Sequence, residues 1–233
     1  MPVIRLLRLP PLLLALMPLA AHALEVHIDP HADLLYRQAL PLLEQADSRD
    51  DSAGTLRTTV GGDPELSRQG QAMAHTLPTA VALLKKSVEL GHPVAQYRLA
   101  LYYMTYLPAA QIPDAACPLL EASLKQGFAA PAPAIAAWCP PYNASSEYRS
   151  ALEAIPNMAT VYAPYYPQPA TRLACSRSRP QGLDMLWGSQ RDYQAEVYRL
   201  LGDLAPQHRQ SLLQKAVDIN GCVTAQQHLT SHP

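Results

Sequence analysis

The sequence predicts an all-α protein: a short α/α solenoid of helix-turn-helix repeats with a Pro/Tyr-rich insertion. Two observations lead to this fold class. Residues 83–91 (LLKKSVELG) and 119–127 (LLEASLKQG) are amphipathic segments of the same pattern, and both stop at a glycine. These glycines, Gly91 and Gly127, lie roughly 36 residues apart, and a period in the mid-thirties is typical of stacked helix pairs.

Each copy of the repeat consists of a first helix, a glycine and a second helix. The copies span residues 78–106, 113–139 and 206–230, of which the third is degenerate. Glycine adopts the left-handed backbone conformation that ends a helix and lets the chain reverse at once. Small side chains in the second helix let it lie close to the first. The second helix of the first copy carries Ala95, Leu99, Ala100 and Tyr103.

Three further elements are predicted before the repeats. Leucines recur with helical spacing over residues 31–47, which predicts a helix that caps the array and is kinked at Pro41. Residues 48–64 (SRDDSAGTLRTTVGGDP) are polar and contain several glycines, so we expect a flexible loop. A short helix over residues 65–76 then leads into the first repeat.

The insertion comprises residues 140–182 and is rich in proline and tyrosine. A short helix is expected near residues 145–154. The segment 162–169 (YAPYYPQP) is expected to be extended, because proline blocks helix formation and restricts the residue before it. Helices are expected to resume over residues 181–204.

The first residues predict export. A short basic region precedes the apolar stretch 12–19 (LLLALMPL), and Ala21-His22-Ala23 supplies small residues at the −3 and −1 positions of a cleavage site. We therefore expect residues 1–23 to be a signal peptide cleaved near Ala23. Residues 24–233 would be a single helical-repeat domain, in the periplasm or secreted. The alternative, an uncleaved membrane anchor, is disfavoured because prolines interrupt the apolar stretch, so no stable membrane anchor is expected.

Four cysteines in the mature part predict two disulfide bonds, because an even number in an exported chain favours them. They are Cys117, Cys139, Cys175 and Cys222. A four-thiolate metal site needs closely spaced pairs, and these residues are far apart. Cys117 and Cys139 are equally far from the expected turn at Phe128, so an antiparallel helix pair would place them side by side. We predict Cys117–Cys139, which leaves Cys175 to pair with Cys222.

Residues 82–103 (ALLKKSVELGHPVAQYRLALYY) resemble the Sel-one-like repeat family, a relative of the tetratricopeptide repeat. The matching positions are Lys86, Ser87, Gly91, Ala95, Gln96, Leu99, Ala100 and Tyr103. Members of this family usually act as adaptors that bind other proteins, and some exported members are immunity proteins beside secreted lipases. The resemblance implies a protein-binding adaptor of the bacterial cell envelope. In its narrower form, it implies an immunity protein that neutralises a secreted toxin in the periplasm.

The expected partner is therefore another protein, such as a secreted effector or an envelope protein. Tyrosine favours protein interfaces because it offers a large contact area with a hydrogen-bonding tip. In the alternative interpretation, the tyrosines of the insertion fold back and cover the edge of the solenoid. The candidate contact residues are Tyr142, Tyr162, Tyr165 and Tyr166.

Other function classes find less support in the sequence. The formal net charge of −1 disfavours nucleic-acid binding, which needs clustered basic residues. The sequence contains no nucleophile elbow, zinc-binding helix or phosphate loop, so no catalytic residue, cofactor or metal is expected.

Two alternatives stay open. One is a β-lactam-binding or hydrolytic enzyme, because some cysteine-rich exported relatives of the family have been linked to β-lactams. The other is a structural or peptidoglycan-associated envelope component. Residues 27–33 (HIDPHAD) hold two histidines and two aspartates and are interpreted as a solvated chain end. His92 is interpreted as a residue that merely follows the glycine of the first helix.

Overall fold

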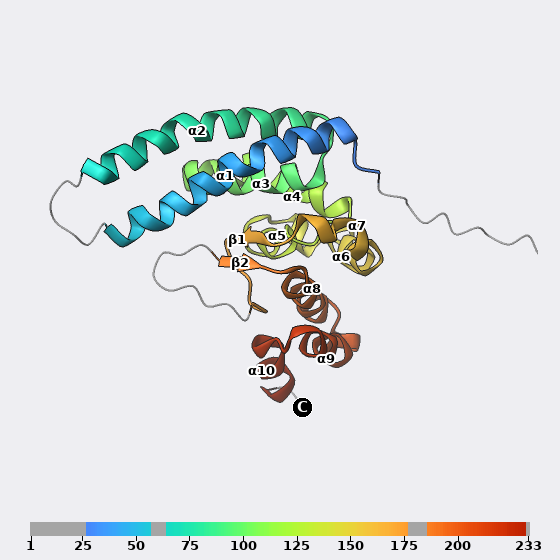
Figure 1. Ribbon diagram of the computed structural model, residues 1–233. Coiled ribbons are helices and arrows are strands. Elements are labelled where there is room, and N and C mark those ends of the chain that lie inside the picture. The colour runs from blue at the N-terminus through green and yellow to red at the C-terminus, as the bar shows by residue number, and fades with distance from the viewer. Residues whose placement is uncertain (1–26, 57–63, 177–185, 232–233) are drawn as a thin grey trace, which may run out of the picture.

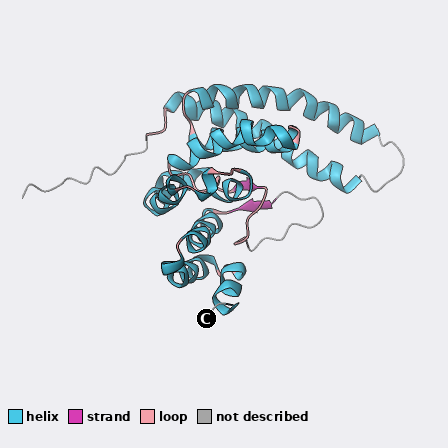
Figure 2. Cartoon of the chain, turned by 180° about the vertical axis from the view of Figure 1, so that it is seen from behind, coloured by secondary structure: helices cyan, strands magenta, loops and turns pink. Residues whose placement is uncertain are grey.

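The computed structural model describes residues 27–56, 64–176 and 186–231, which are helical over most of their length (Figure 1). The predicted all-α fold class is thereby confirmed. Helices succeed one another in chain order from the blue α1 and the teal to green α2 to the red α9 and α10 (Figure 1). The view from behind shows that helices, in cyan, dominate the described chain and that the strands, in magenta, are short (Figure 2).

Paired helices form the N-terminal half. They are α1 (Pro30–Leu56), α2 (Pro64–Glu89), α3 (Pro93–Tyr106) and α4 (Ile112–Lys125). α1 lies along α2, and α3 packs on both α2 and α4. Each helix after the first therefore has a neighbour on two sides, which lets an amphipathic helix bury a wide apolar stripe.

The C-terminal half contains shorter helices and one small antiparallel sheet. Its elements are α5 (Ala132–Trp138), α6 (Ser146–Ala154), α7 (Ala159–Tyr162), β1 (Gln168–Ala170), β2 (Leu186–Gly188), α8 (Gln190–Leu204), α9 (Arg209–Asn220) and α10 (Val223–Ser231). In the sheet, Gln168 lies opposite Gly188, and Ala170 lies opposite Leu186. α8 packs on α9, and α9 packs on α10. β1 belongs to the insertion, so this sheet ties the insertion to the chain that enters α8.

Three glycines end first helices of the predicted repeats, as their positions in the sequence suggested. Gly91, Gly127 and Gly221 have φ angles of 83°, 88° and 73°. This left-handed conformation favours glycine because it has no Cβ. In the first repeat, the helix that follows begins at once, with Pro93 in its first turn and the His92 side chain accepting a hydrogen bond from the Ala95 amide. Proline is well tolerated at this point because its missing N–H would have no partner in the helix.

α1 is longer than the sequence predicts. It continues through Pro41 and ends at Leu56, so the prediction of a loop over residues 48–64 is wrong for 48–56. Residues 57–63 lie outside the described part of the chain. Helix propensity is a weak guide when a segment packs along a neighbouring helix, as α1 does along α2.

α2 joins two elements that the sequence analysis separated. The predicted short helix over residues 65–76 and the first helix of the first repeat are one element that runs through Pro78. Proline removes a helical hydrogen bond and normally interrupts a helix. The helix persists here because residues just after the proline, including Ala80 and Leu84, are buried in the core.

The insertion is partly as predicted. The helix near residues 145–154 is confirmed as α6, whose first turn is capped by the Ser145 hydroxyl. The expectation that segment 162–169 is extended is wrong at its start, because Ala163–Tyr165 forms a 3-10 turn directly after α7. Pro164 lies in the first positions of that turn, where its missing N–H is tolerated.

The helix predicted over residues 181–204 begins later than expected. Its described part is the strand β2 followed by α8, which starts at Gln190; residues 177–185 lie outside the described part. Ser189 and Asp192 explain this start, because they form a reciprocal capping box: each side chain accepts a hydrogen bond from the backbone amide of the other.

Both predicted disulfide bonds are present. Cys117 and Cys139 are joined with Cα atoms 5.6 Å apart, and Cys175 and Cys222 with Cα atoms 4.5 Å apart. The first bond connects α4 to the end of α5, at the open end of the helix pair. The second connects the segment after β1 to the turn between α9 and α10. The pairing predicted from an antiparallel helix pair in the second repeat is therefore confirmed.

A substitution at Ala95 tests the packing of the first repeat. Ala95 is fully buried on α3, so Ala95→Leu should overpack the helix pair and lower the free energy of unfolding by about 1–3 kcal/mol. Ala109→Leu, at an exposed position between α3 and α4, should change it by less than about 0.5 kcal/mol. Urea denaturation of the two variants measures the difference. Equal stability of both variants would place Ala95 outside the core.

Candidate partner-binding surface

Two of the four tyrosines predicted to contact a partner lie against the core. The Tyr162 side chain is 2% exposed, and its hydroxyl donates a hydrogen bond to the Gln126 carbonyl at 2.7 Å. Its ring lies 5.2 Å from the ring of Phe128, and the Tyr166 ring lies 5.4 Å from Phe128 and 5.6 Å from Tyr193. Burial raises the pKa values of Tyr162 and Tyr166. These two tyrosines therefore fold back onto the segment that follows α4, as the alternative interpretation expected.

The other two candidates, Tyr142 and Tyr165, are half-buried, as the Tyr166 side chain is. The Tyr165 hydroxyl donates a hydrogen bond to Asp33 at 2.8 Å, and burial, aided by the carboxylate, raises the pKa of Tyr165 to about 12. Tyr142 lies beneath the Lys125 ammonium, which is 5.0 Å from the centre of its ring. Contacts within the chain thus use much of both rings.

A more exposed tyrosine cluster lies on the C-terminal half of α3. The Tyr102 ring lies 5.7 Å from that of Tyr103 and 5.0 Å from that of Tyr106. Tyr106 is 48% exposed, whereas Tyr102 and Tyr103 are half-buried. We call these three residues the α3 tyrosine face. The repeat-defining residues Ala95, Leu99 and Ala100 occupy the buried first half of the same helix.

The α3 tyrosine face has the physical properties of a contact surface. Its rings support one another, so little side-chain entropy is lost when a partner covers them. They combine apolar area with hydroxyl groups, the combination that is enriched at binding hot spots. The rigid helix beneath them is held by packing on both α2 and α4. This surface can therefore present a preformed set of anchors to another protein.

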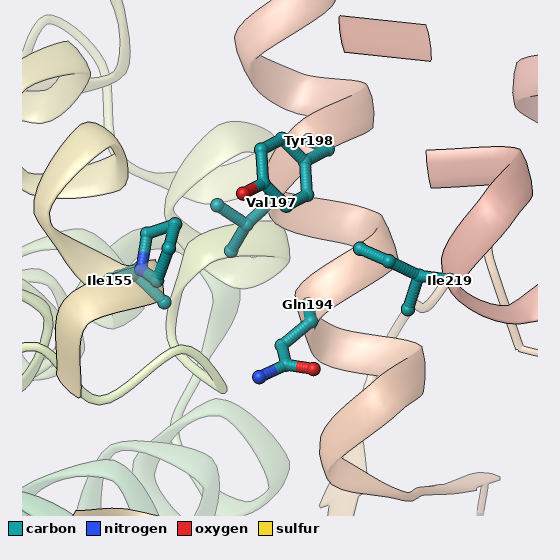
Figure 3. Close-up of a pocket in the computed structure, with 6 residues that line it drawn as sticks. Ile155, Gln194, Val197, Tyr198 and Ile219 are labelled. Carbon is teal, nitrogen blue, oxygen red and sulfur yellow. The ribbon is translucent and has the colours of Figure 1, made fainter. Parts of the chain in front are cut away.

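A small apolar pocket lies between the turn after α6, α8 and α9 (Figure 3). Its lining residues are Ile155, Pro156, Gln194, Val197, Tyr198 and Ile219. α8 supplies the residues between Ile155 on one side and Ile219 on the other (Figure 3). The volume is about 170 Å³. Pockets for whole small molecules measure roughly 300–1,000 Å³, so this one fits a single apolar side chain better than a substrate.

A polar depression of about 340 Å³ lies beside α5, α8 and α10. Its charged groups are largely paired with one another. The Arg199 guanidinium lies 2.6 Å from Glu196 and 2.7 Å from Asp203, and Glu196 also accepts a hydrogen bond from the Cys175 amide at 2.9 Å. These contacts hold α8 against the disulfide-linked segment, so the pairing has a structural role.

Residues from three distant segments meet around His92, contrary to two interpretations of the sequence. The imidazole is fully buried, whereas it was interpreted as a residue that merely follows a glycine. Asp33, interpreted as part of a solvated end, lies 3.4 Å from the His92 Nε2 atom and accepts hydrogen bonds from Arg37 and Tyr165. Burial tends to raise the pKa of Asp33, but these hydrogen bonds outweigh it and hold the pKa below its ordinary value. Asp29 caps α1 by accepting hydrogen bonds from the His31 and Ala32 amides.

The sequence does contain a signal for the α3 tyrosine face. Tyr102 and Tyr106 are four residues apart, so they share one side of a helix, and Tyr103 is adjacent. The predicted contact residues lie in the insertion, where tyrosine is frequent. The buried position of His92 has no comparable signal, since Asp33 lies 59 residues before it in the sequence and Tyr165 lies far beyond it.

Some features are not found among the described residues. No helix in the described ranges is long and apolar enough to cross a membrane. In the same part of the chain, no three His, Cys, Asp or Glu side chains gather as ligands for a metal ion. Comparison of the chain with protein-family models, with curated proteins and with solved structures finds no match.

Proposed function

We propose that this chain is an exported bacterial protein that binds another protein through the α3 tyrosine face. The observation that carries the proposal is the cluster of Tyr102, Tyr103 and Tyr106, whose rings contact one another and remain partly exposed on a rigid helix. The resemblance of residues 82–103 to the Sel-one-like repeat supports an adaptor role. A secreted effector or an envelope protein is the proposed partner, and neutralisation of a secreted toxin is the narrower form of the proposal.

The proposed compartment is the periplasm or the cell exterior. Both disulfide bonds support it, because such bonds persist in oxidising compartments and are rare in the cytosol. The short apolar stretch and the cleavage site that ends at Ala23 support it independently.

Substitution of two tyrosines tests the binding surface. A Tyr102→Ala, Tyr106→Ala variant should keep the helical circular dichroism of the wild type. It should bind the partner isolated with the wild-type protein about tenfold to a hundredfold more weakly, because truncating the two interface tyrosines together should cost roughly 1.4–2.8 kcal/mol. Titration calorimetry with the purified partner measures the change.

Val223→Ala is the matched control. Val223 is an exposed apolar residue on α10, at the other end of the helix order, so its truncation should leave affinity unchanged. Full affinity of a folded double-tyrosine variant would contradict the proposal, because binding would then use another surface.

A further inference from the structure

His92 makes two hydrogen bonds that together define its protonation state. Its Nδ1 atom accepts a hydrogen bond from the Ala95 amide at 3.2 Å and so caps α3. An acceptor nitrogen carries no proton, so the ring proton must be on Nε2, which faces the Asp33 carboxylate at 3.4 Å. The imidazole is therefore neutral in the folded protein, in its Nε2–H form.

The groups around the imidazole come from every element that packs on it. α1 supplies Asp33, the Tyr36 ring, which stacks on the imidazole at 4.9 Å, and Arg37, which is bonded to Asp33. The insertion supplies Tyr165, whose ring meets the imidazole edge at 5.6 Å. From α3, Arg98 acts electrostatically on Tyr36. One carboxylate thus faces the imidazole, and this carboxylate is already shared with Arg37 and Tyr165.

A second proton on His92 would conflict with this arrangement. Protonated Nδ1 is a donor and would face the Ala95 amide, which is also a donor, so the cap of α3 would be lost. The positive charge would be fully buried, with Arg37 close by and no further acid facing the ring in the described contacts. Attraction to Asp33 over 3.4 Å offsets part of this cost. Movement of the imidazole out of its buried position would remove the remaining free-energy cost.

We propose that His92 is an acid-sensitive latch that holds the insertion and the start of α3 against α1, and that protonation of its imidazole opens it. Tyr165 moves with the latch because its hydroxyl and ring contact Asp33 and His92. Gln168 should move together with Tyr165, since its side-chain amide donates one hydrogen bond to the Tyr36 hydroxyl at 3.4 Å and another to the Tyr165 carbonyl. Opening therefore loosens the attachment of segment 165–170, which includes β1, to α1.

The direction of the pH dependence follows from burial. Burial lowers the pKa of His92 below its ordinary value of 6.5, although Asp33 opposes the shift. The unfolded chain thus binds this proton more readily, so the stabilisation is complete above pH 6.5 and is lost as pH falls from there towards the lower folded pKa. Asp33, whose pKa is held below 3.8, loses its contribution only in more acidic solution. The two steps are therefore separate.

Hydrogen exchange on the full mature protein tests the latch. Peptides that cover residues 92–97 and 163–170 should lose protection as pH falls from 7.5 to 5, after correction for the intrinsic pH dependence of exchange. His92→Asn keeps a good helix cap but cannot take up the proton, so this variant should lack the pH-dependent loss. His75→Asn, at an exposed histidine of α2, should behave like the wild type.

The same loss of protection in His92→Asn would overturn the proposal, and so would full protection of both peptides in the wild type at pH 5. Imidazole nitrogen NMR of the wild type gives an independent check if His92→Asn does not fold. The proposal requires the Nε2–H form at pH 7.5 and loss of the Ala95 amide hydrogen bond when His92 is protonated. An Nδ1–H form at pH 7.5, or protonation without any change at Ala95, would contradict it.

Discussion

Phe128→Ala should lower the free energy of unfolding by about 3–5 kcal/mol, because it removes the centre of the aromatic core. Phe128 is the one phenylalanine of the chain and is fully buried. Its ring lies 5.8 Å from Tyr97, 5.2 Å from Tyr162 and 5.4 Å from Tyr166. These rings come from α3, α7 and the segment before β1, so alanine would leave a cavity where three segments meet.

Urea denaturation of the oxidised protein measures this effect. Leu34→Ala is the control, because Leu34 is an exposed apolar residue on α1, and its change should stay within about 0.5 kcal/mol. A loss of less than about 1 kcal/mol for Phe128→Ala would mean that the insertion does not pack on the repeats through this ring.

Removal of the second disulfide bond is expected to have a similarly large effect. Cys175→Ala with Cys222→Ala should cost about 3–4 kcal/mol, since the bond closes a segment of 47 residues and restricts the unfolded chain. Both cysteines are buried in a small cluster under the last helices. The other members of this cluster are Ala195, Leu213, Ala216 and Ala225.

The first disulfide bond provides the matched comparison. It closes a segment of 22 residues, so its removal by alanine substitution should cost roughly 0.7 kcal/mol less on the chain-entropy model. Denaturation of the two double variants measures both costs, and non-reducing peptide mapping of the wild type verifies the bonds. Peptides that join Cys117 to Cys175, or Cys139 to Cys222, would contradict the structure.

The features that could be predicted from the sequence depend on short-range geometry. A glycine after an amphipathic run ends a helix whatever surrounds it, so Gly91 and Gly127 marked two turns correctly. Once the turn after Gly127 was known, antiparallel packing placed Cys117 beside Cys139, and the remaining pair followed. These inferences need only the dimensions of a helix pair.

The features that could not be predicted depend on contacts between distant segments. α2 passes through Pro78 because the residues beyond it are buried against the rest of the core, and no local pattern reports this. Tyr165 and Asp33 are 132 residues apart in sequence, and the residues between them include several helices whose packing brings the two together. Whether a tyrosine contacts solvent or the core is also decided by contacts between distant segments, so the sequence left both positions open for Tyr162 and did not single out the exposed Tyr106.

Site-specific photo-crosslinking in intact cells tests the central claim, that the protein binds another protein through the α3 tyrosine face. A photoreactive phenylalanine analogue replaces Tyr106 in one strain and the exposed Val223 of α10 in another. We expect one discrete crosslinked adduct from position 106, in the periplasmic or secreted fraction, that disappears when Tyr102→Ala is added. No such adduct is expected from position 223. The claim is contradicted if position 106 yields no adduct, or if both positions yield the same one.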